Sequence, residues 1–336
     1  MAIAQRLQMK PPCIKLNMSG YEPFLDFLKA YAIVCVLIGH TFPLIDKIGY
    51  PFWAGMQVPI FVLIQAFHVL KKSSSELNLK KIFFRILLPY LLVLFGIILI
   101  YLFLGGIDNM LIVNGLTRGG YGPGSYYPWI YVQLAIILHF VRPLFSKDNL
   151  PKQTLLWLVV CEGFEMLESY INLPDPIHRL LAIRYLFLIY LAWLWVEDGI
   201  VINKVTILLS VLSGLSIAYF YYCNVNNEPL FYTTGWAFQR WPCYFYVSSL
   251  FCYLLHVIFA SVSKISFFDK IIKFLAKCSY EIFLVQMAVI AVCPRFGFIE
   301  NKYLSLSMWI TFVWISSLAG GYVFNQIYSK ILKGIR

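Results

Sequence analysis

The chain has 336 residues, of which 60% are hydrophobic and 13% are charged, and its mean hydropathy is +0.75. This composition lies outside the range of soluble globular proteins and predicts an integral membrane protein. The formal net charge of +11 does not indicate a nucleic-acid-binding protein, because the cations fall mainly in short loops between apolar runs.

Ten apolar runs follow one another along the chain, each close to the roughly 20 residues that cross a bilayer. They lie at about 24–43, 50–70, 82–104, 126–145, 153–171, 179–196, 200–222, 241–261, 271–293 and 304–326. Residues 1–23 form a leader that lacks the apolar core of a cleavable signal peptide, and residues 327–336 form a short tail. We therefore expect an all-α polytopic membrane protein with a single domain over residues 24–326.

Lysine and arginine are distributed unequally between the two sets of loops. With the N-terminus in the cytoplasm, about 18 of them fall on the cytoplasmic side and about 6 on the opposite side. Because cytoplasmic loops carry the excess of these residues, we expect both termini to be cytoplasmic and the number of spans to be even.

The first apolar run, FLDFLKAYAIVCVLIGHTF over residues 24–42, carries three ionisable groups, Asp26, Lys29 and His40. On an α-helix Lys29 and His40 fall within about 20° of one stripe, with His40 ~16 Å further along, and Asp26 lies within about 40° of it. One interpretation is that the charges reach the cytoplasmic interface and the histidine is structural. The other is an interior site, because ionisable groups in membrane helices cost on the order of 2.5–3.5 kcal/mol each and usually face protein or water.

The third run opens with KKIFFRILLPY, which places Lys81 and Arg85 four residues apart, just inside the cytoplasmic boundary. Anchoring at the interface would explain Lys71, Lys72 and Lys80, whereas the role of Lys81 stays open. Arg85 lies within the apolar run beside Pro89, and a guanidinium there favours an anionic partner such as phosphate. Lys81 and Arg85 are therefore candidates for binding a donor phosphate.

The fifth run contains Glu162, Glu165 and Glu168, spaced three residues apart on one helical face. Carboxylates on a membrane helix should face protein or water, where they could contact hydroxyls of a polar acceptor or mark a poorly inserted helix. Glu162, in the middle of the run, is the better site candidate.

A glycine-rich outer segment leads into GPGSYYPWIYVQ over residues 122–133. Tyr126 and Tyr127 are either interfacial anchors or, beside a site, contacts for a sugar. Gln133 lies deeper and needs a polar partner, and Arg240, at the outer start of the eighth run, is similarly ambiguous.

The chain resembles the acyltransferase-3 family of membrane acyltransferases. That family carries Arg or Lys, ten residues and then His in its first span, and Lys29 and His40 fit this spacing. KKIFFRILLPY is similar to its basic, proline-bearing third span, and KCSYEIFLVQ is similar to its late S-Y-x-I-Y-L-x-H stretch. The chain departs from the pattern at Lys29, where Arg is commoner, in the spacing of its third-span basic residues, and at Gln286, where many members have His.

The resemblance implies transfer of an acyl group, usually acetyl from acetyl-CoA, to a hydroxyl of a cell-envelope or extracellular carbohydrate. His40 would act as general base, Lys29 with Asp26 would stabilise charge, and Lys81 with Arg85 would hold the CoA phosphates. A transient acyl-histidine stays open. The expected acceptor contacts are Glu162, Gln133, Tyr126, Tyr127 and Arg240.

The main alternative is a transporter or flippase for a lipid-linked saccharide, in which the same charges would line a pathway. The absence of inverted sequence repeats counts against it. A different donor such as succinyl-CoA is open, as are the acceptor and a homo-oligomeric state. The membrane-bound O-acyltransferase family also uses an intramembrane histidine, but the early position of His40 argues against that family.

No metal cofactor is expected, since the eight cysteines lack paired spacing and most lie in apolar runs. The expected partners are membrane lipid and the carbohydrate acceptor, without nucleic acid. The expected location is the bacterial cytoplasmic membrane.

Overall fold

The computed structural model describes the chain in separate stretches. These are residues 13–14, 23–42, 57–71, 77–104, 118–171, 173–201, 252–293 and 306–335, with scattered residues at 113–115 and 207–228. Most residues in these stretches are helical, as the all-α expectation requires. The strands that are described form one antiparallel pair, β1 (Cys13–Ile14) with β2 (Ile200–Val201).

The longer helices are α2 (Pro23–Thr41), α4 (Gln57–Leu70), α6 (Leu88–Phe103), α8 (Tyr127–Val141), α9 (Leu150–Tyr170), α11 (Leu186–Asp198), α14 (Cys252–Val262), α15 (Ser266–Val292) and α16 (Leu306–Ile335). The shorter ones are α5 (Leu79–Ile82), the π-helical turn η3 (Phe83–Leu87), the 3-10 turns η4 (Arg142–Leu144) and η5 (Ile183–Tyr185), and α10 (Asp175–Leu180).

Four helical runs in the described stretches are long and apolar enough to cross a membrane. They are Pro23–Thr41, Leu79–Phe103, Ser266–Val292 and Leu306–Lys333, and Gln57–Leu70 and Leu150–Cys161 are shorter apolar helices. The helices therefore agree with an integral membrane protein. The count of ten spans and the cytoplasmic position of both termini stay predictions, because much of residues 200–251 lies outside the described stretches.

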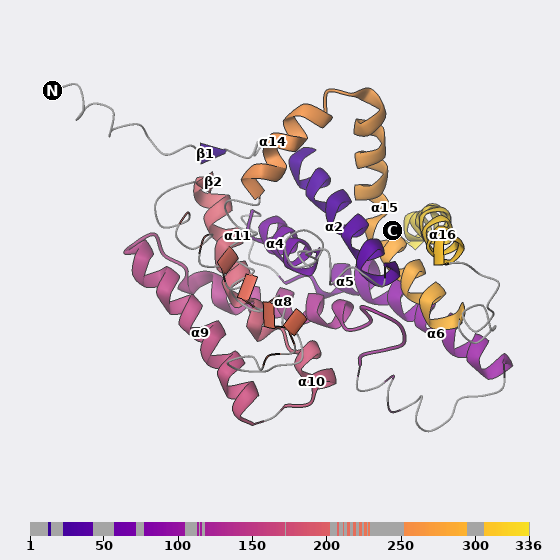
Figure 1. Ribbon diagram of the computed structural model, residues 1–336, viewed down its shortest axis with the longest axis horizontal. Helices are drawn as coiled ribbons and strands as arrows, with labels where there is room; N and C mark the ends of the chain where they lie inside the picture. The colour runs from indigo at the N-terminus through magenta and orange to yellow at the C-terminus, as the bar shows by residue number, and fades with distance from the viewer. Residues whose placement is uncertain are drawn as a thin grey trace.

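Helix α2 crosses the middle of the molecule between α4 and α15 (Figure 1). Leu25, Leu28 and Ala32 pack in one apolar core with α4, α8 and α11, whereas Ile33 and Leu37 pack in a second core with α6 and α15. A helix that is apolar on all sides is buried on all sides. Polar groups on α2 therefore face other helices for most of its length.

Helices α15 and α16 pack with their backbones in close contact. A Cβ atom added to Gly321 would lie 2.7 Å from the backbone nitrogen of Ile282, closer than real side chains come. Small residues allow membrane helices to approach in this way. Helix α16 also continues to Ile335, through residues 327–335 that the sequence assigned to a tail, and Tyr328 within this extension is buried against the bundle.

The sixth expected span, residues 179–196, is not one continuous helix. It is broken between α10 and α11, where Leu181 is extended and η5 follows. Helix α11 has 13 residues, and most of its side chains are buried in protein, as is usual for apolar helices too short to cross a bilayer. Arg184 in η5 is 1% exposed, with Nη1 2.7 Å from Nε2 of His178 and Nη2 donating to the Tyr185 hydroxyl at 2.9 Å.

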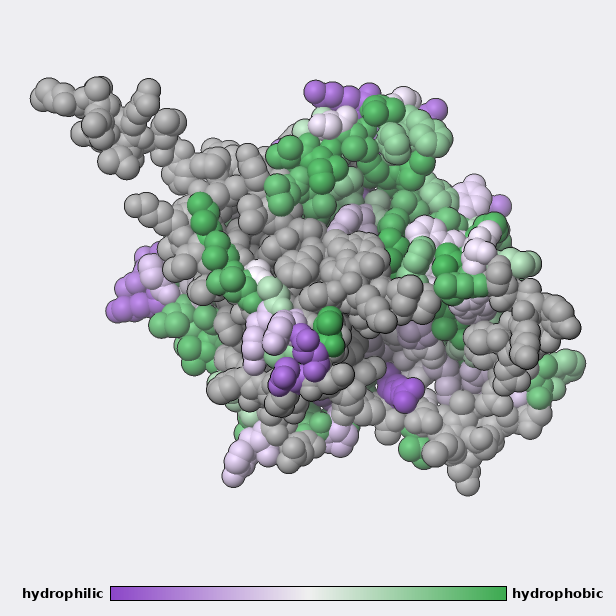
Figure 2. All heavy atoms as spheres, in the orientation of Figure 1, coloured by the Kyte–Doolittle hydropathy of each residue, from purple (hydrophilic) through white to green (hydrophobic). Residues whose placement is uncertain are grey.

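Apolar side chains cover much of the visible surface, and hydrophilic side chains gather above the turn between α14 and α15 (Figure 2). That turn is followed by Lys270 and Lys273, and Lys273 pairs with Asp269 at 2.6 Å. Five described cysteines, namely Cys35, Cys161, Cys223, Cys278 and Cys293, are buried, as expected for small apolar side chains.

Candidate active site

His40 lies in the last turn of α2 and meets a polar side chain from the opposite end of the sequence. Nε2 of Gln286, on α15, is 3.0 Å from Nδ1 of His40. Gln286 is fully buried, while the imidazole of His40 is half-buried. Helices α2 and α15 pack along one another, so this contact joins two well-packed elements.

The end of α2 is also tied to α16, next to His40. The Thr41 hydroxyl donates to the Leu37 carbonyl at 2.6 Å, and Nε1 of Trp314 donates to the Thr41 hydroxyl at 3.1 Å. These bonds hold the turn that carries His40, so the imidazole is presented by a fixed backbone.

Asp26 and Lys29, in the first two turns of α2, form an ion pair of 2.9 Å between Oδ1 and Nζ. Their side chains are 19% and 25% exposed, so each keeps some access to solvent within the bundle. The predicted carboxylate–ammonium pair is therefore present, at the opposite end of α2 from the imidazole.

Arg85 lies in the π-helical turn η3, and Pro89 provides the reason for this geometry. Proline has no N–H, so the Arg85 carbonyl has no donor four residues further on. Across η3 the bonding shifts to five residues, with the Leu88 N–H donating to the Phe83 carbonyl. Such turns are frequent at functional sites, and this one places an exposed guanidinium inside an apolar helix.

Tyrosines from two other helices bond to the carbonyls of η3. The Tyr280 hydroxyl donates to the Ile86 carbonyl at 2.7 Å, and the Tyr328 hydroxyl donates to the Phe84 carbonyl. Helices α15 and α16 thus hold the turn that carries Arg85. Lys81, in α5, is also exposed, one turn nearer the start of the helix.

His68, near the end of α4, connects these cationic groups and was not singled out by sequence reasoning. It lies within electrostatic range of Lys29, Lys71, Arg85 and Asp26. Basic side chains of α2 and η3 and the lysine that follows α4 therefore act electrostatically on His68. The signal in the sequence was a histidine three residues before a lysine pair, which also fits an ordinary interface.

Gly122 and Gly124, in the described part of the glycine-rich segment, pack against the stretch of α15 that carries Gln286. Gly122 has φ +91°, and an added Cβ atom would lie 2.5 Å from the Met287 carbonyl oxygen. The carbonyl of Gly119 accepts hydrogen bonds from the Tyr90 hydroxyl and from Nε1 of Trp129. These glycines are thus tied to α6 and α8 and lie against α15 at the residue that follows Gln286.

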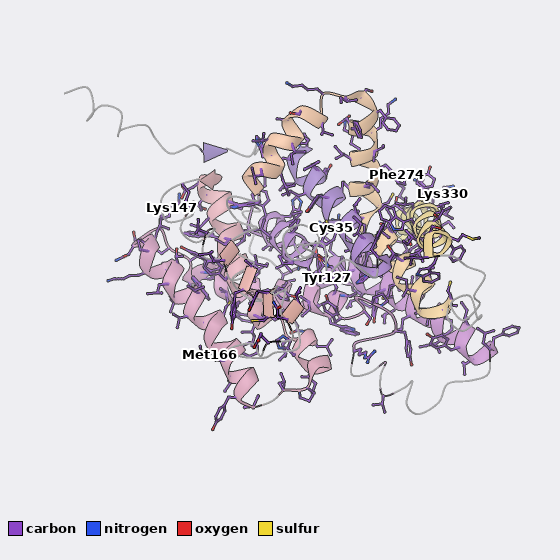
Figure 3. The ribbon with its side chains drawn as sticks, viewed as in Figure 1. Cys35, Tyr127, Lys147, Met166, Phe274 and Lys330 are labelled. Atoms are coloured by element: carbon purple, nitrogen blue, oxygen red, sulfur yellow. The ribbon has the colours of Figure 1, made fainter. Side chains whose placement is uncertain are left out.

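Tyr127 lies in the middle of the molecule (Figure 3), where its ring packs between Phe61 and Phe283 at centroid distances of 6.0 and 5.9 Å. Tyr126 is buried at the start of α8. Tyr127 is therefore in contact with the part of α15 that precedes Gln286, and both tyrosines are buried or partly buried in the bundle.

Gln133 binds backbone at the break between α10 and η5. Its Nε2 donates to the Leu180 carbonyl at 2.6 Å, and its Oε1 accepts from the Ala182 N–H at 3.2 Å. Both the nitrogen and the oxygen of the amide are therefore hydrogen-bonded, and they bridge the backbone on either side of the break in the sixth expected span. The side chain of Glu162 and the whole of Arg240 lie outside what the structure describes.

These observations define a helical integral membrane protein with an imidazole near one end of a central helix and basic groups near the other. The sequence profile of an acyltransferase domain, that of the acyltransferase-3 family, matches residues 22–326, so the chain belongs to this family of membrane acyltransferases. No curated protein and no solved structure matches the chain.

Proposed function

We propose that this protein is a membrane O-acyltransferase that moves an acyl group, usually acetyl, from acyl-CoA to a hydroxyl of a cell-envelope or extracellular carbohydrate. The observation that carries the proposal is the position of His40, which is half-buried and hydrogen-bonded to Gln286 on α15, and the next residue of that helix, Met287, lies against Gly122. An imidazole in such a place can take a proton from a hydroxyl near neutral pH.

The donor would bind by its phosphates to the basic groups at the other end of α2. Lys29 and Arg85 both act electrostatically on His68, and Lys81 lies one helical turn before Arg85. Arginine suits phosphate because its fork donates two parallel hydrogen bonds. The extended arm of CoA would then follow α2 for the ~16 Å between Lys29 and His40.

The reaction that fits these groups is direct transfer. Nε2 of His40 takes the hydroxyl proton of the acceptor while the oxygen attacks the thioester carbonyl carbon. A C–O bond forms, the C–S bond breaks, and the CoA thiolate leaves and takes up a proton. The route through an acyl-histidine has the same overall balance and uses the same residue.

The acceptor would approach from the side of the glycine-rich segment, with Tyr126 and Tyr127 as the nearest of the proposed contacts. Glu162, Gln133 and Arg240 stay in the proposed acceptor set, although for Gln133 a bracing role in the broken sixth span is the better supported one. We place the protein in a bacterial cytoplasmic membrane, with lipid around it and no metal in the reaction.

Labelled acetyl-CoA incubated with membranes that contain the protein tests the proposal. Wild type should release CoA and move the label to an envelope carbohydrate, His40→Ala should lose this transfer by about 10²- to 10⁴-fold, and His139→Ala should retain it. His139 is the matched control because it is an exposed histidine in another apolar helix, α8. Full transfer by His40→Ala would remove the assigned base, and wild type that leaves acetyl-CoA intact would favour a transporter.

A further inference from the structure

The buried amide of Gln286 is the polar partner of His40. Within the described ranges, Gln286 is the side chain whose hydrogen bond to this imidazole the structure shows, with its amide 3.0 Å from Nδ1. Histidine–carboxylate couples fix a tautomer by charge, but here the partner is neutral. What Gln286 does to His40 therefore depends on which end of its amide faces the ring.

Amide oxygen and nitrogen are nearly the same size, so one side-chain position serves two hydrogen-bond arrangements. In the first, Gln286 Nε2 donates to an unprotonated Nδ1, and the neutral ring carries its proton on Nε2. In the second, Gln286 Oε1 accepts from Nδ1–H, and Nε2 of His40 keeps a lone pair. Only the second arrangement leaves a base at the far nitrogen.

Once the imidazole has taken a proton, both of its nitrogens carry hydrogen and only the second arrangement is compatible with the cation. With Nε2 placed towards His40, Oε1 of Gln286 is buried and has no hydrogen bond in the described part of the chain. Turning the amide gives Oε1 a donor and takes this bond from the NH2 group instead, so the protonated ring decides between the two arrangements.

We infer that Gln286 is a positioning residue that accepts a hydrogen bond from Nδ1–H of His40 through Oε1, so that Nε2 of His40 faces the substrate as the base. This inference rests on the proposed function and extends it. In this chain Gln286, which stands where many family members have His, would orient the imidazole as a neutral hydrogen-bond acceptor.

Two substitutions separate the orienting role from a packing role. Gln286→Leu keeps a similar volume and removes the acceptor, and we expect kcat to fall about 10- to 100-fold with little change in KM for acetyl-CoA. Gln286→Glu restores an acceptor and adds charge, so kcat should return to within a few-fold of wild type. Because a carboxylate stabilises the imidazolium, the acid limb of its pH–rate profile should move to higher pH.

Gln65→Leu is the matched control for loss of a buried amide. Gln65 is also buried, its Nε2 donates to the Tyr131 carbonyl at 2.8 Å, and its Oε1 likewise has no hydrogen bond among the described residues. This variant should leave the acid limb where wild type has it. The inference would be overturned if Gln286→Leu kept the kcat and the acid limb of the pH–rate profile of wild type. It would also be overturned if the acid limb of Gln286→Glu stayed at the pH of wild type.

A spectroscopic test does not depend on turnover. In ¹⁵N-histidine-labelled protein the nitrogen shifts of the neutral ring distinguish its two tautomers, and the chain has five histidines, so His40→Ala assigns the signal. We expect the Nδ1–H tautomer of His40 in wild type and a mixture in Gln286→Leu. An Nε2–H tautomer in wild type refutes the inference even if the enzyme is active, whereas absence of acetyl-CoA turnover with the Nδ1–H tautomer present refutes only the proposed function.

Discussion

The Tyr280 hydroxyl donates a 2.7 Å hydrogen bond to the carbonyl of Ile86, so α15 holds the π-helical turn that carries Arg85. The same helix carries Gln286, which hydrogen-bonds to His40. One element therefore positions both the basic group proposed for the donor and the imidazole proposed for the acceptor.

Removing that hydroxyl should disturb donor binding. Tyr280→Phe leaves the ring in place but removes the bond to Ile86, and KM for acetyl-CoA should rise about 2- to 10-fold, in line with a net value of ~0.5–1.5 kcal/mol for such a bond. Tyr322→Phe, at an exposed position on α16, is the control. An unchanged KM in Tyr280→Phe would mean that η3 holds Arg85 without this bond.

The ion pair on α2 predicts a graded response to substitution. Lys29→Ala leaves the carboxylate of Asp26 in a half-buried place without its partner, and transfer should fall about 10- to 100-fold, because the site loses a positioned charge. Lys29→Arg keeps the charge and should retain most activity. Steady-state kinetics with labelled acetyl-CoA would measure both, and equal loss in the two variants would show that shape, not charge, matters at this position.

Gly122 offers a test of the outer segment. A Cβ at this residue would meet the Met287 carbonyl, and the backbone is in a left-handed conformation, so Gly122→Ala should destabilise the protein by about 1–3 kcal/mol and lower transfer. Gly96→Ala is the matched control, because Gly96 lies in α6 and nothing surrounds its added Cβ within 4 Å. That variant should be neutral or stabilising by about 0.5–1 kcal/mol. Thermal unfolding in detergent would compare them, and equal midpoints would contradict the prediction.

Lys147 predicts a pH effect on stability outside the spans. It lies at the edge of the molecule (Figure 3), and its hydrogen bonds to Asp198 and Glu197 raise the pKa of its ammonium group. A lysine whose pKa is raised by folding contributes stability below its ordinary pKa and loses it as pH rises through the raised value. Lys147→Met should therefore unfold at a slightly lower temperature than wild type at neutral pH. The loss in free energy of unfolding should be no more than ~1 kcal/mol, because the ion pairs are exposed.

That difference should disappear at strongly alkaline pH, where the ammonium is neutral in wild type as well. Lys152→Met, on the exposed side of α9, is the control for loss of a surface cation. A difference that persists unchanged across the whole pH range would show that Lys147 acts by packing.

The first-span stripe was the part of the site that sequence reasoning could reach. Local helical geometry alone places Asp26 three residues from Lys29, and the structure confirms their ion pair. The contact between His40 and Gln286 joins residues 246 positions apart, and no local pattern specifies such a pairing. The sequence shows Lys71 three residues after His68, but the influence of Lys29 and Arg85 on His68 comes from separate helices and has no local signal.

The fold shows the same division. Apolar run lengths predicted the helices around α2, α6, α15 and α16, and in the described part of the chain these are the helices long and apolar enough to cross a membrane. Hydropathy did not reveal the break at Leu181, because residues 180–183 are all apolar and the backbone groups on either side of it bond to Gln133 from another helix. It also ended the last helix too early, since burial of Tyr328 continues α16 beyond the apolar run.

The position of α2 between two apolar cores has a consequence for how the protein is made. At roughly 5–20 residues per second, the ribosome needs about 12–50 s to travel from His40 to Gln286. During that interval the first membrane helix has none of its α15 contacts, but it can already form its internal Asp26–Lys29 ion pair. A chain halted before α15 would thus contain the Asp26–Lys29 pair, but its His40 would lack the contact with Gln286. Nascent chains should therefore become able to carry out the proposed transfer only after the ninth expected span has been synthesised.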